Sequence, residues 1–198
     1  VMYDQLLKSS GYANRRHEIE KFNREHELTK RGIALTPVKF GISFTTAFLN
    51  QAGALVHIYT DGTIAVNHGG TEMGQGLNTK IHGIASAEFG VSPHFIKVSV
   101  TNTSKVPNTS ATAASSGSDL NGMAVKNAIG KLKLRLADVA VEMLKTRLNI
   151  DSIAADQIIF AENYIFAASH PEEKIAFREL VNKAYLNQVS LSATGFYK

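Results

Sequence analysis

Cysteine and tryptophan are absent from this sequence of 198 residues, and proline occurs only four times. A chain without cysteine can form no disulfide, no cysteine-ligated iron–sulfur cluster and no thiolate zinc site. No apolar run reaches the roughly 20 residues that a membrane-spanning helix needs, and residues 1–5 lack the basic start of a signal peptide. We therefore expect a cytoplasmic protein that does not enter a membrane.

The pattern of charge also lacks the signature of a nucleic-acid interface. The formal net charge is +4, but the basic residues are spread along the chain instead of gathering on one face with aromatic residues. We interpret them as solvated helix faces and expect no nucleic-acid partner. The seven histidines contain no pair with the close helical spacing of a zinc motif, so no metal site is expected. For His68 we expect a structural hydrogen bond.

The first part of the chain has a polar, helical pattern with only a thin apolar stripe, which includes Ile19 and Phe22. A helix of this kind is usually stabilised by packing on another element. We therefore predict a helical lead-in over residues 1–30 and a domain over residues 31–198. Hydrophobic residues make up 44% of the sequence, enough for a sizeable core.

Strand-like and helix-like patterns follow one another in the predicted domain. Asp61-Gly62 between two β-branched runs is a strong hairpin signal, and Gly90 is a typical residue just after a helix. A mixture without strict βαβ alternation predicts an α+β fold, a mixed sheet with helices packed on it. We predict a buried strand or pocket wall over residues 40–50, strands over 54–59, 63–67, 95–101, 157–160, 164–166 and 189–193, and helices over 77–89, 120–148 and 177–186.

The segment 68–80 has four glycines in the eight residues from Gly69 to Gly76, between a predicted strand and a predicted helix. Glycines let the backbone adopt positive φ and approach a ligand closely. A helix that starts near Gln75 would direct its free N–H groups and its positive dipole end into this loop. Such a loop suits a phosphate or another anionic group, so we predict a phosphorylated cofactor.

A nicotinamide dinucleotide is disfavoured as that cofactor. The stretch from Gly74 to Thr79 nearly matches the dinucleotide fingerprint, but Thr79 replaces the third glycine. No acidic residue lies between Phe89 and Asp119, where the ribose-binding acid belongs. Lys80 does not follow a glycine, which excludes a P-loop.

A second segment, residues 109–118, is rich in Ser, Thr and Ala and precedes the longest predicted helix. Its composition alone favours a flexible surface loop. Small hydroxyl residues and backbone amides can nevertheless line an anion site. Because both segments end at predicted helix N-termini, we consider that the two helix ends converge on one extended, charged ligand.

These residues resemble the molybdenum-cofactor domain of the xanthine dehydrogenase/aldehyde oxidase family. The resemblance extends from about Arg16 to Lys198, and residues 40–48 are similar to the xanthine dehydrogenase branch. The segments that carry it are residues 39–45, 48–54 and 68–80, Val106-Pro107-Asn108-Thr109, Thr112-Ala113-Ala114-Ser115, Ser118-Asp119-Leu120-Asn121-Gly122 and residues 189–197.

The resemblance implies a site for the molybdenum–molybdopterin cofactor, whose metal is held by the cofactor's own dithiolene. It also implies a purine pocket, in which Phe44 and Thr45 contact the purine and Phe48 and Leu49 form the entrance wall. Iron–sulfur clusters and FAD are implied on other subunits or domains, since this chain has no cysteine. By position, the cofactor contacts are Met73, Gly74, Gln75, Thr112, Ala113, Ala114 and Ser115.

The family's Gly-Glu-Pro-Pro segment, which carries its catalytic glutamate, is absent from this sequence, so no catalytic residue is assigned. We expect a subunit fragment that is inactive alone and needs the remaining molybdenum-domain segments and an iron–sulfur/FAD subunit. The complete enzyme would oxidise hypoxanthine and xanthine to urate in purine catabolism. Two alternatives stay open: an aldehyde oxidase-type hydroxylase domain, and a structural scaffold beside a cofactor held elsewhere.

Overall fold

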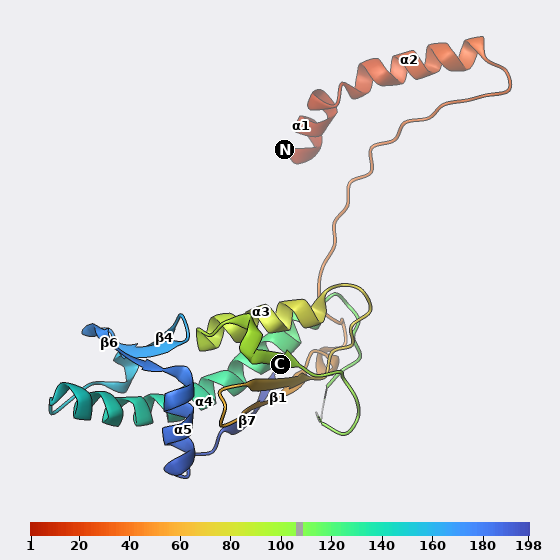
Figure 1. The fold of residues 1–198 in the computed structure, drawn as a ribbon. Coiled ribbons are helices and arrows are strands. Elements are labelled where there is room, and N and C mark those ends of the chain that lie inside the picture. The colour runs from red at the N-terminus through yellow and green to blue at the C-terminus, as the bar shows by residue number, and fades with distance from the viewer. Residues whose placement is uncertain (106–108) are drawn as a thin grey trace. The chain divides into compact units, whose positions relative to one another are not determined.

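Two helices and the residues after them form the first of two units in the computed structural model, which describes residues 1–105 and 109–198 (Figure 1). This unit, Val1–Gly41, contains α1 (Met2–Ser9) and α2 (Tyr12–Glu25). The Phe22 ring stacks on His26 with 3.8 Å between ring centroids. The second unit is Ile42–Lys198. The predicted domain division after residue 30 stays a prediction.

The second unit is built on a four-stranded mixed sheet in the order β3-β2-β1-β7. Strand β1 (Ala52–Ile58) and β2 (Ile64–His68) form the predicted hairpin. In its turn, the Asp61 carboxylate accepts hydrogen bonds from the backbone N–H and the hydroxyl of Thr63. Strand β3 (Ile96–Val98) pairs parallel with β2, and β7 (Ser192–Tyr197) pairs antiparallel with β1.

Three helices complete the core of this unit, and all three agree with the predictions. They are α3 (Leu77–Phe89), α4 (Gly117–Leu148) and α5 (Phe177–Leu186). The long helix α4 packs against α3, α5, β1 and β7. Its buried residues Val125, Ile129, Leu132 and Leu136 recur at the three- and four-residue spacing of one helix face. The predicted α+β class, a mixed sheet with helices packed on it, is confirmed.

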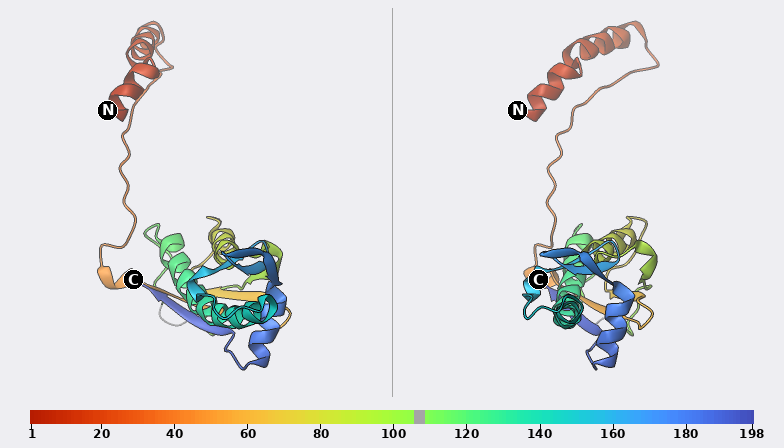
Figure 2. Two further views of the ribbon diagram at one scale, coloured as in Figure 1. Left: turned by 90° about the vertical axis from the view of Figure 1, so that its left-hand side faces the viewer. Right: turned by 60° about the vertical axis from the view of Figure 1, so that its left-hand side comes forward.

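A second, three-stranded sheet lies beside the C-terminal part of α4 (Figure 2). It consists of β4 (Ile158–Ala161), β5 (Tyr164–Ala167) and β6 (His170–Ala176), all antiparallel. Strand β6 was not predicted, because its sequence HPEEKIA lacks apolar alternation and only Ile175 is buried. Among the described residues, no helix combines the length and the apolar character needed to cross a membrane.

Three predicted strands differ from the structure. Residues 40–50 form a loop with one short 3-10 helix (Ala47–Leu49), because the Asn50 amide bonds both the N–H and the C=O of Phe44 and closes a turn. Strand β3 covers only Ile96–Val98, in the first half of the predicted strand 95–101. The last strand starts at Ser192, since the residues before it connect α5 to the sheet.

Candidate functional site

His68, the last residue of β2, fixes the start of the glycine-rich loop. Its Nδ1 accepts a hydrogen bond from the Gly70 N–H at 3.1 Å, so its Nε2 carries the proton and donates to Asn78 Oδ1 at 2.9 Å. The ring is 1% exposed. His68 therefore links the end of β2, the loop and the first turn of α3, and the expected structural hydrogen bond is confirmed.

Burial lowers the pKa of His68 below its ordinary value. His68 therefore binds a proton more readily in the unfolded chain than in the folded one. As a result, the free energy of unfolding falls as the pH drops below about 6.5. We expect a loss of at most about 1.4 kcal/mol per pH unit within that window. The thermal unfolding midpoint, measured from pH 7.5 to 5 with and without His68→Asn, checks this prediction. An identical pH slope in both proteins would contradict it.

Two glycines of the loop are required by close packing. A Cβ on Gly70 would lie 2.5 Å from Leu77 Cδ2 and 2.8 Å from Asn121 Nδ2, and a Cβ on Gly69 would lie 2.2 Å from the Thr109 side chain. The loop therefore passes directly over the starts of α3 and α4. Thr101 adds a further tie, since its hydroxyl donates to the carbonyl oxygens of His68 and Gly70.

The N-terminus of α3 already holds an anion, the carboxylate of Glu72. Its Oε1 accepts hydrogen bonds from the N–H groups of Gly74 and Gly76 at 3.0 and 2.9 Å, and its Oε2 accepts one from the Asn78 N–H at 2.9 Å. Gly74 and Gly76 both have positive φ, which turns these N–H groups inward. In this structure the protein's own carboxylate therefore accepts one N–H group of the first turn of α3, and the external anion expected at this helix start stays a prediction.

The second loop, residues 109–116, is joined to the first. The Thr71 N–H donates to the Thr112 hydroxyl at 2.8 Å. Ala114 and Ser115 adopt positive φ, unusual for residues with a Cβ. Within the described residues, no side-chain hydrogen bond caps the start of α4. This helix N-terminus thus differs from that of α3: it has an acidic residue, Asp119, in its first turn, but no carboxylate hydrogen bond to its first N–H groups is seen within the described residues.

A cavity of about 540 Å³ lies between the two loops. The predicted cofactor contacts Met73, Gln75 and residues 112–115 all line it, whereas Gly74 is not among the lining residues and donates its N–H to Glu72. The described lining residues include one lysine and no acid. The cavity is therefore suited to an anionic ligand with a polar edge. Its other lining residues, which were not predicted, are Leu77, Lys80, Gly117 and Ser118.

These four residues could have been found from the helix geometry. Leu77 and Lys80 are one turn apart at the start of α3, and Gly117 and Ser118 open α4. The side chain of Lys80 supplies the positive charge in the lining. Once two helix ends are expected to converge, their first-turn residues are the natural candidates for the cavity wall.

The predicted purine contacts do not line this cavity. Phe44, Thr45, Phe48 and Leu49 lie on the adjoining loop, where Phe44 is half-buried and Phe48 is 70% exposed. The loop is tied to the cavity wall by the Ser43 N–H, which donates to the Ala114 carbonyl oxygen at 3.0 Å. A backbone hydrogen bond from the Ser110 N–H to the Gln51 carbonyl oxygen adds a second tie.

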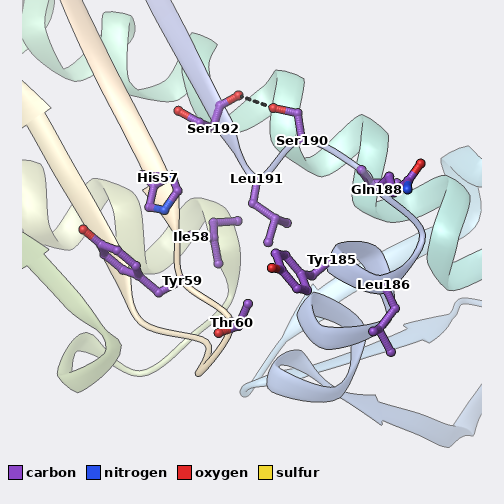
Figure 3. Close-up of a pocket in the computed structure, with 11 residues that line it drawn as sticks. His57, Ile58, Tyr59, Thr60, Tyr185, Leu186, Gln188, Ser190, Leu191 and Ser192 are labelled. Carbon is purple, nitrogen blue, oxygen red and sulfur yellow. Dashed lines mark hydrogen bonds between the residues drawn. The ribbon is translucent and has the colours of Figure 1, made fainter.

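A larger groove, of about 700 Å³, lies elsewhere in the unit, between the end of β1 and the end of α5 (Figure 3). The rings of His57 and Tyr59 meet edge to face there, with 4.5 Å between centroids, and Tyr185 lies across from them. No predicted site residue belongs to this groove. Among residues 1–105 and 109–198, no group of three or more His, Asp or Glu side chains could hold a metal ion.

Comparison with known proteins identifies the family. A model described as the molybdopterin cofactor-binding domain matches residues 5–198. Xanthine dehydrogenase of Emericella nidulans is 44% identical over 198 residues, all of this chain, and that of Calliphora vicina is 46% identical over 196 residues, 99% of this chain. The chain spans 12% of the length of either relative. The motif segment Val106-Pro107-Asn108 lies outside the residues that the structure describes.

Solved structures share the fold. Quinoline 2-oxidoreductase from Pseudomonas putida 86 matches with a TM-score of 0.65 and 22% identity over 75% of this chain and 19% of its own. A reconstituted CO dehydrogenase from Oligotropha carboxidovorans matches with a TM-score of 0.67 and 16% identity over 98% of this chain and 25% of its own. At these identities the likeness establishes the fold. Together with the family model, it shows that the chain belongs to the molybdopterin cofactor-binding domain family.

Proposed function

We propose that this chain holds the molybdopterin cofactor in a molybdenum hydroxylase that oxidises hypoxanthine and xanthine to urate. The observation that carries the proposal is the cavity between residues 71–77 and 112–118, where six of the seven cofactor contacts implied by the family meet. The choice of substrate rests on the 44–46% identity to proteins named xanthine dehydrogenase.

The residues present fit such a group in size and in charge. A cavity of about 540 Å³ lies within the range of about 300–1,000 Å³ that is usual for cofactor sites. The start of α4, with Ser115, Gly117 and Ser118, offers N–H and hydroxyl donors to the phosphate of the cofactor. The Met73 N–H is donated to Gln75 Oε1, so the second amide hydrogen of Gln75 and the carbonyl oxygen of Met73 are the groups that this loop offers to polar edges of the pterin.

When bound, the cofactor supplies the molybdenum, held by its dithiolene, and the redox chemistry of purine hydroxylation. The part of this chain is to bind and orient that group. Thr112 assists by holding the two loops together through the Thr71 N–H. The first turn of α4 stabilises negative charge next to residues 112–115.

The purine pocket is proposed for the loop that precedes β1. This loop lies next to the cavity wall, because the Ser43 N–H donates a hydrogen bond to the Ala114 carbonyl oxygen. Phe44 offers an aromatic ring to a flat heterocycle, and Thr45 offers a hydroxyl. Phe48 and Leu49 lie on the short 3-10 helix and would line the entrance. We propose the catalytic glutamate, the iron–sulfur clusters and FAD on other segments or subunits of a cytoplasmic enzyme of purine catabolism.

Gln75→Ala tests this function in the complete enzyme. Because Gln75 both lines the cavity and closes the loop onto Thr71, we expect urate formation from xanthine to fall about tenfold, as for the loss of one to two hydrogen bonds. Gln157→Ala is the matched control, since Gln157 is exposed and precedes β4, outside the cavity lining.

The alternatives give different results in the same experiment. Unchanged molybdenum content and an unchanged rate in Gln75→Ala would favour a structural scaffold beside a cofactor held elsewhere. An enzyme that forms no urate but oxidises aromatic aldehydes would retain the family and overturn the substrate.

A further inference from the structure

We infer that Glu72 is a positioning residue of the cofactor site, whose carboxylate holds Met73 and Gln75 at the cavity wall. This inference rests on the proposed function. It assigns to Glu72 no contact with substrate or cofactor, because its side chain does not line the cavity.

The carboxylate is the centre around which residues 73–78 wrap. Gly74 and Gly76 lie on either side of Gln75, and the N–H groups of both donate to the same carboxylate oxygen. One side chain therefore fixes the Met73–Gly74 and Gln75–Gly76 peptide units. The second oxygen accepts the Asn78 N–H, which ties this arrangement to the first turn of α3.

The Gln75 side chain is fixed in turn by the loop that Glu72 shapes. Its Oε1 accepts the Met73 N–H at 2.6 Å, and its Nε2 donates to the Thr71 carbonyl oxygen at 2.9 Å. Thr71 itself donates to Thr112 on the opposite wall. A chain of hydrogen bonds thus runs from the Glu72 carboxylate through the loop backbone to the second half of the cavity.

An ordinary helix cap would look different. A capping side chain belongs to the residue at the helix start, whereas Glu72 lies four residues before the capping position Gly76. Only Asn78, among its three donors, belongs to α3. The helix is also anchored by its buried residues Leu77, Ile81, Ala85 and Phe89. Loss of the carboxylate should therefore loosen the loop and leave the fold intact.

The charge state of Glu72 agrees with this role. The backbone hydrogen bond from Asn78, followed by those from Gly76 and Gly74, lowers the pKa of the Glu72 carboxyl below its ordinary value. The carboxylate is thus ionised at neutral pH, and ionised acceptors make the stronger hydrogen bonds.

The test compares Glu72→Gln and Glu72→Ala in the complete enzyme. Glutamine keeps one acceptor oxygen, whereas alanine keeps none. Removing a group that orients a contacting residue typically costs about 10- to 100-fold in affinity. We therefore expect the pterin to be lost about tenfold faster on dialysis from Glu72→Gln, and faster still from Glu72→Ala. Hydrogen exchange of residues 73–78 should rise in the same order.

Asp61→Asn is the matched control. Asp61 is also an exposed carboxylate that accepts a backbone N–H within a turn, but it lies in the β1–β2 hairpin and outside the cavity lining. Its pterin retention and the hydrogen exchange of residues 73–78 should equal those of the unaltered enzyme. The thermal midpoint of the cofactor-free protein should stay the same in both Glu72 variants.

Each other outcome has a clear meaning. Pterin retention in the Glu72 variants equal to that of Asp61→Asn, with loss in Gln75→Ala, would overturn the role of Glu72 and leave the proposed function standing. Retention in Gln75→Ala as well would overturn the proposed function itself. A thermal midpoint that falls in step with the pterin loss would make Glu72 a general stability residue and overturn the positioning role.

Discussion

Replacing Gly195 with alanine is expected to destabilise the second unit by about 3 kcal/mol, the upper end of the usual cost of overpacking. Gly195 lies in β7 where that strand crosses α4. A Cβ at this position would be 1.9 Å from the Ala124 carbonyl oxygen and 2.6 Å from the Ala128 nitrogen. Both are backbone atoms of the long helix, so no side-chain rotation can relieve the overlap. The helix and the sheet must move apart.

Gly130→Ala is the control for this substitution. Gly130 lies in the middle of α4, and a Cβ there meets no described atom within 4 Å. Alanine is favoured over glycine inside a helix by about 1 kcal/mol, so this variant should be more stable. The thermal unfolding midpoint of each variant measures both effects. Equal midpoints for the two variants would contradict the close approach of β7 to α4.

Ser118→Glu is expected to empty the cofactor site. Ser118 lines the cavity in the first turn of α4, where we propose that the cofactor phosphate binds. One added negative charge about 5 Å from an anion costs about 3 kcal/mol at an effective dielectric constant of about 20, roughly 100-fold in affinity. Molybdenum and pterin content per enzyme should fall accordingly.

This variant separates binding from folding. A glutamate in the first turn of a helix favours the helix through its dipole, so the fold of α4 should not be weakened. Ser118→Gln has nearly the same size without the charge and should retain far more cofactor. Equal losses in Ser118→Glu and Ser118→Gln would point to a steric effect and contradict an anion at this helix start.

The regular elements were predictable where the local signals agreed. Asp61-Gly62 marks the β1–β2 turn because it lies between two β-branched runs. Helix α3 is defined by the spacing of its apolar residues and ends at Gly90, whose positive φ of 63° favours glycine. The residues that make up each signal lie within a few positions of one another, so these elements can be predicted from the sequence without knowledge of the tertiary structure.

Elements that depend on distant partners were not predictable. Strand β6 carries charged residues, and its pairing with β5 is what makes it a strand. Residues 40–50 have the composition of a strand, but the Asn50 amide bonds Phe44 and makes a loop. In both cases a contact outside the local pattern decides the structure.

The candidate site, too, was predictable where local sequence decides the structure and unpredictable where a contact outside the local pattern decides it. The convergence of two helix starts on one cavity could be inferred from the Gly-rich and Ser-rich segments. The difference between the N-termini of α3 and α4 could not be inferred, because it depends on the position of the Glu72 side chain. Glu72 fills the start of α3 with a carboxylate, whereas within the described residues the start of α4 has no side-chain cap.

The proposed cofactor site is tested most directly by a density map of the complete, cofactor-loaded enzyme at a resolution that shows the pterin. We expect pterin density within hydrogen-bond distance of Gln75, with its phosphate at residues 115–118. Density that places the cofactor away from both loops, for example in the groove lined by His57 and Tyr185, would contradict it.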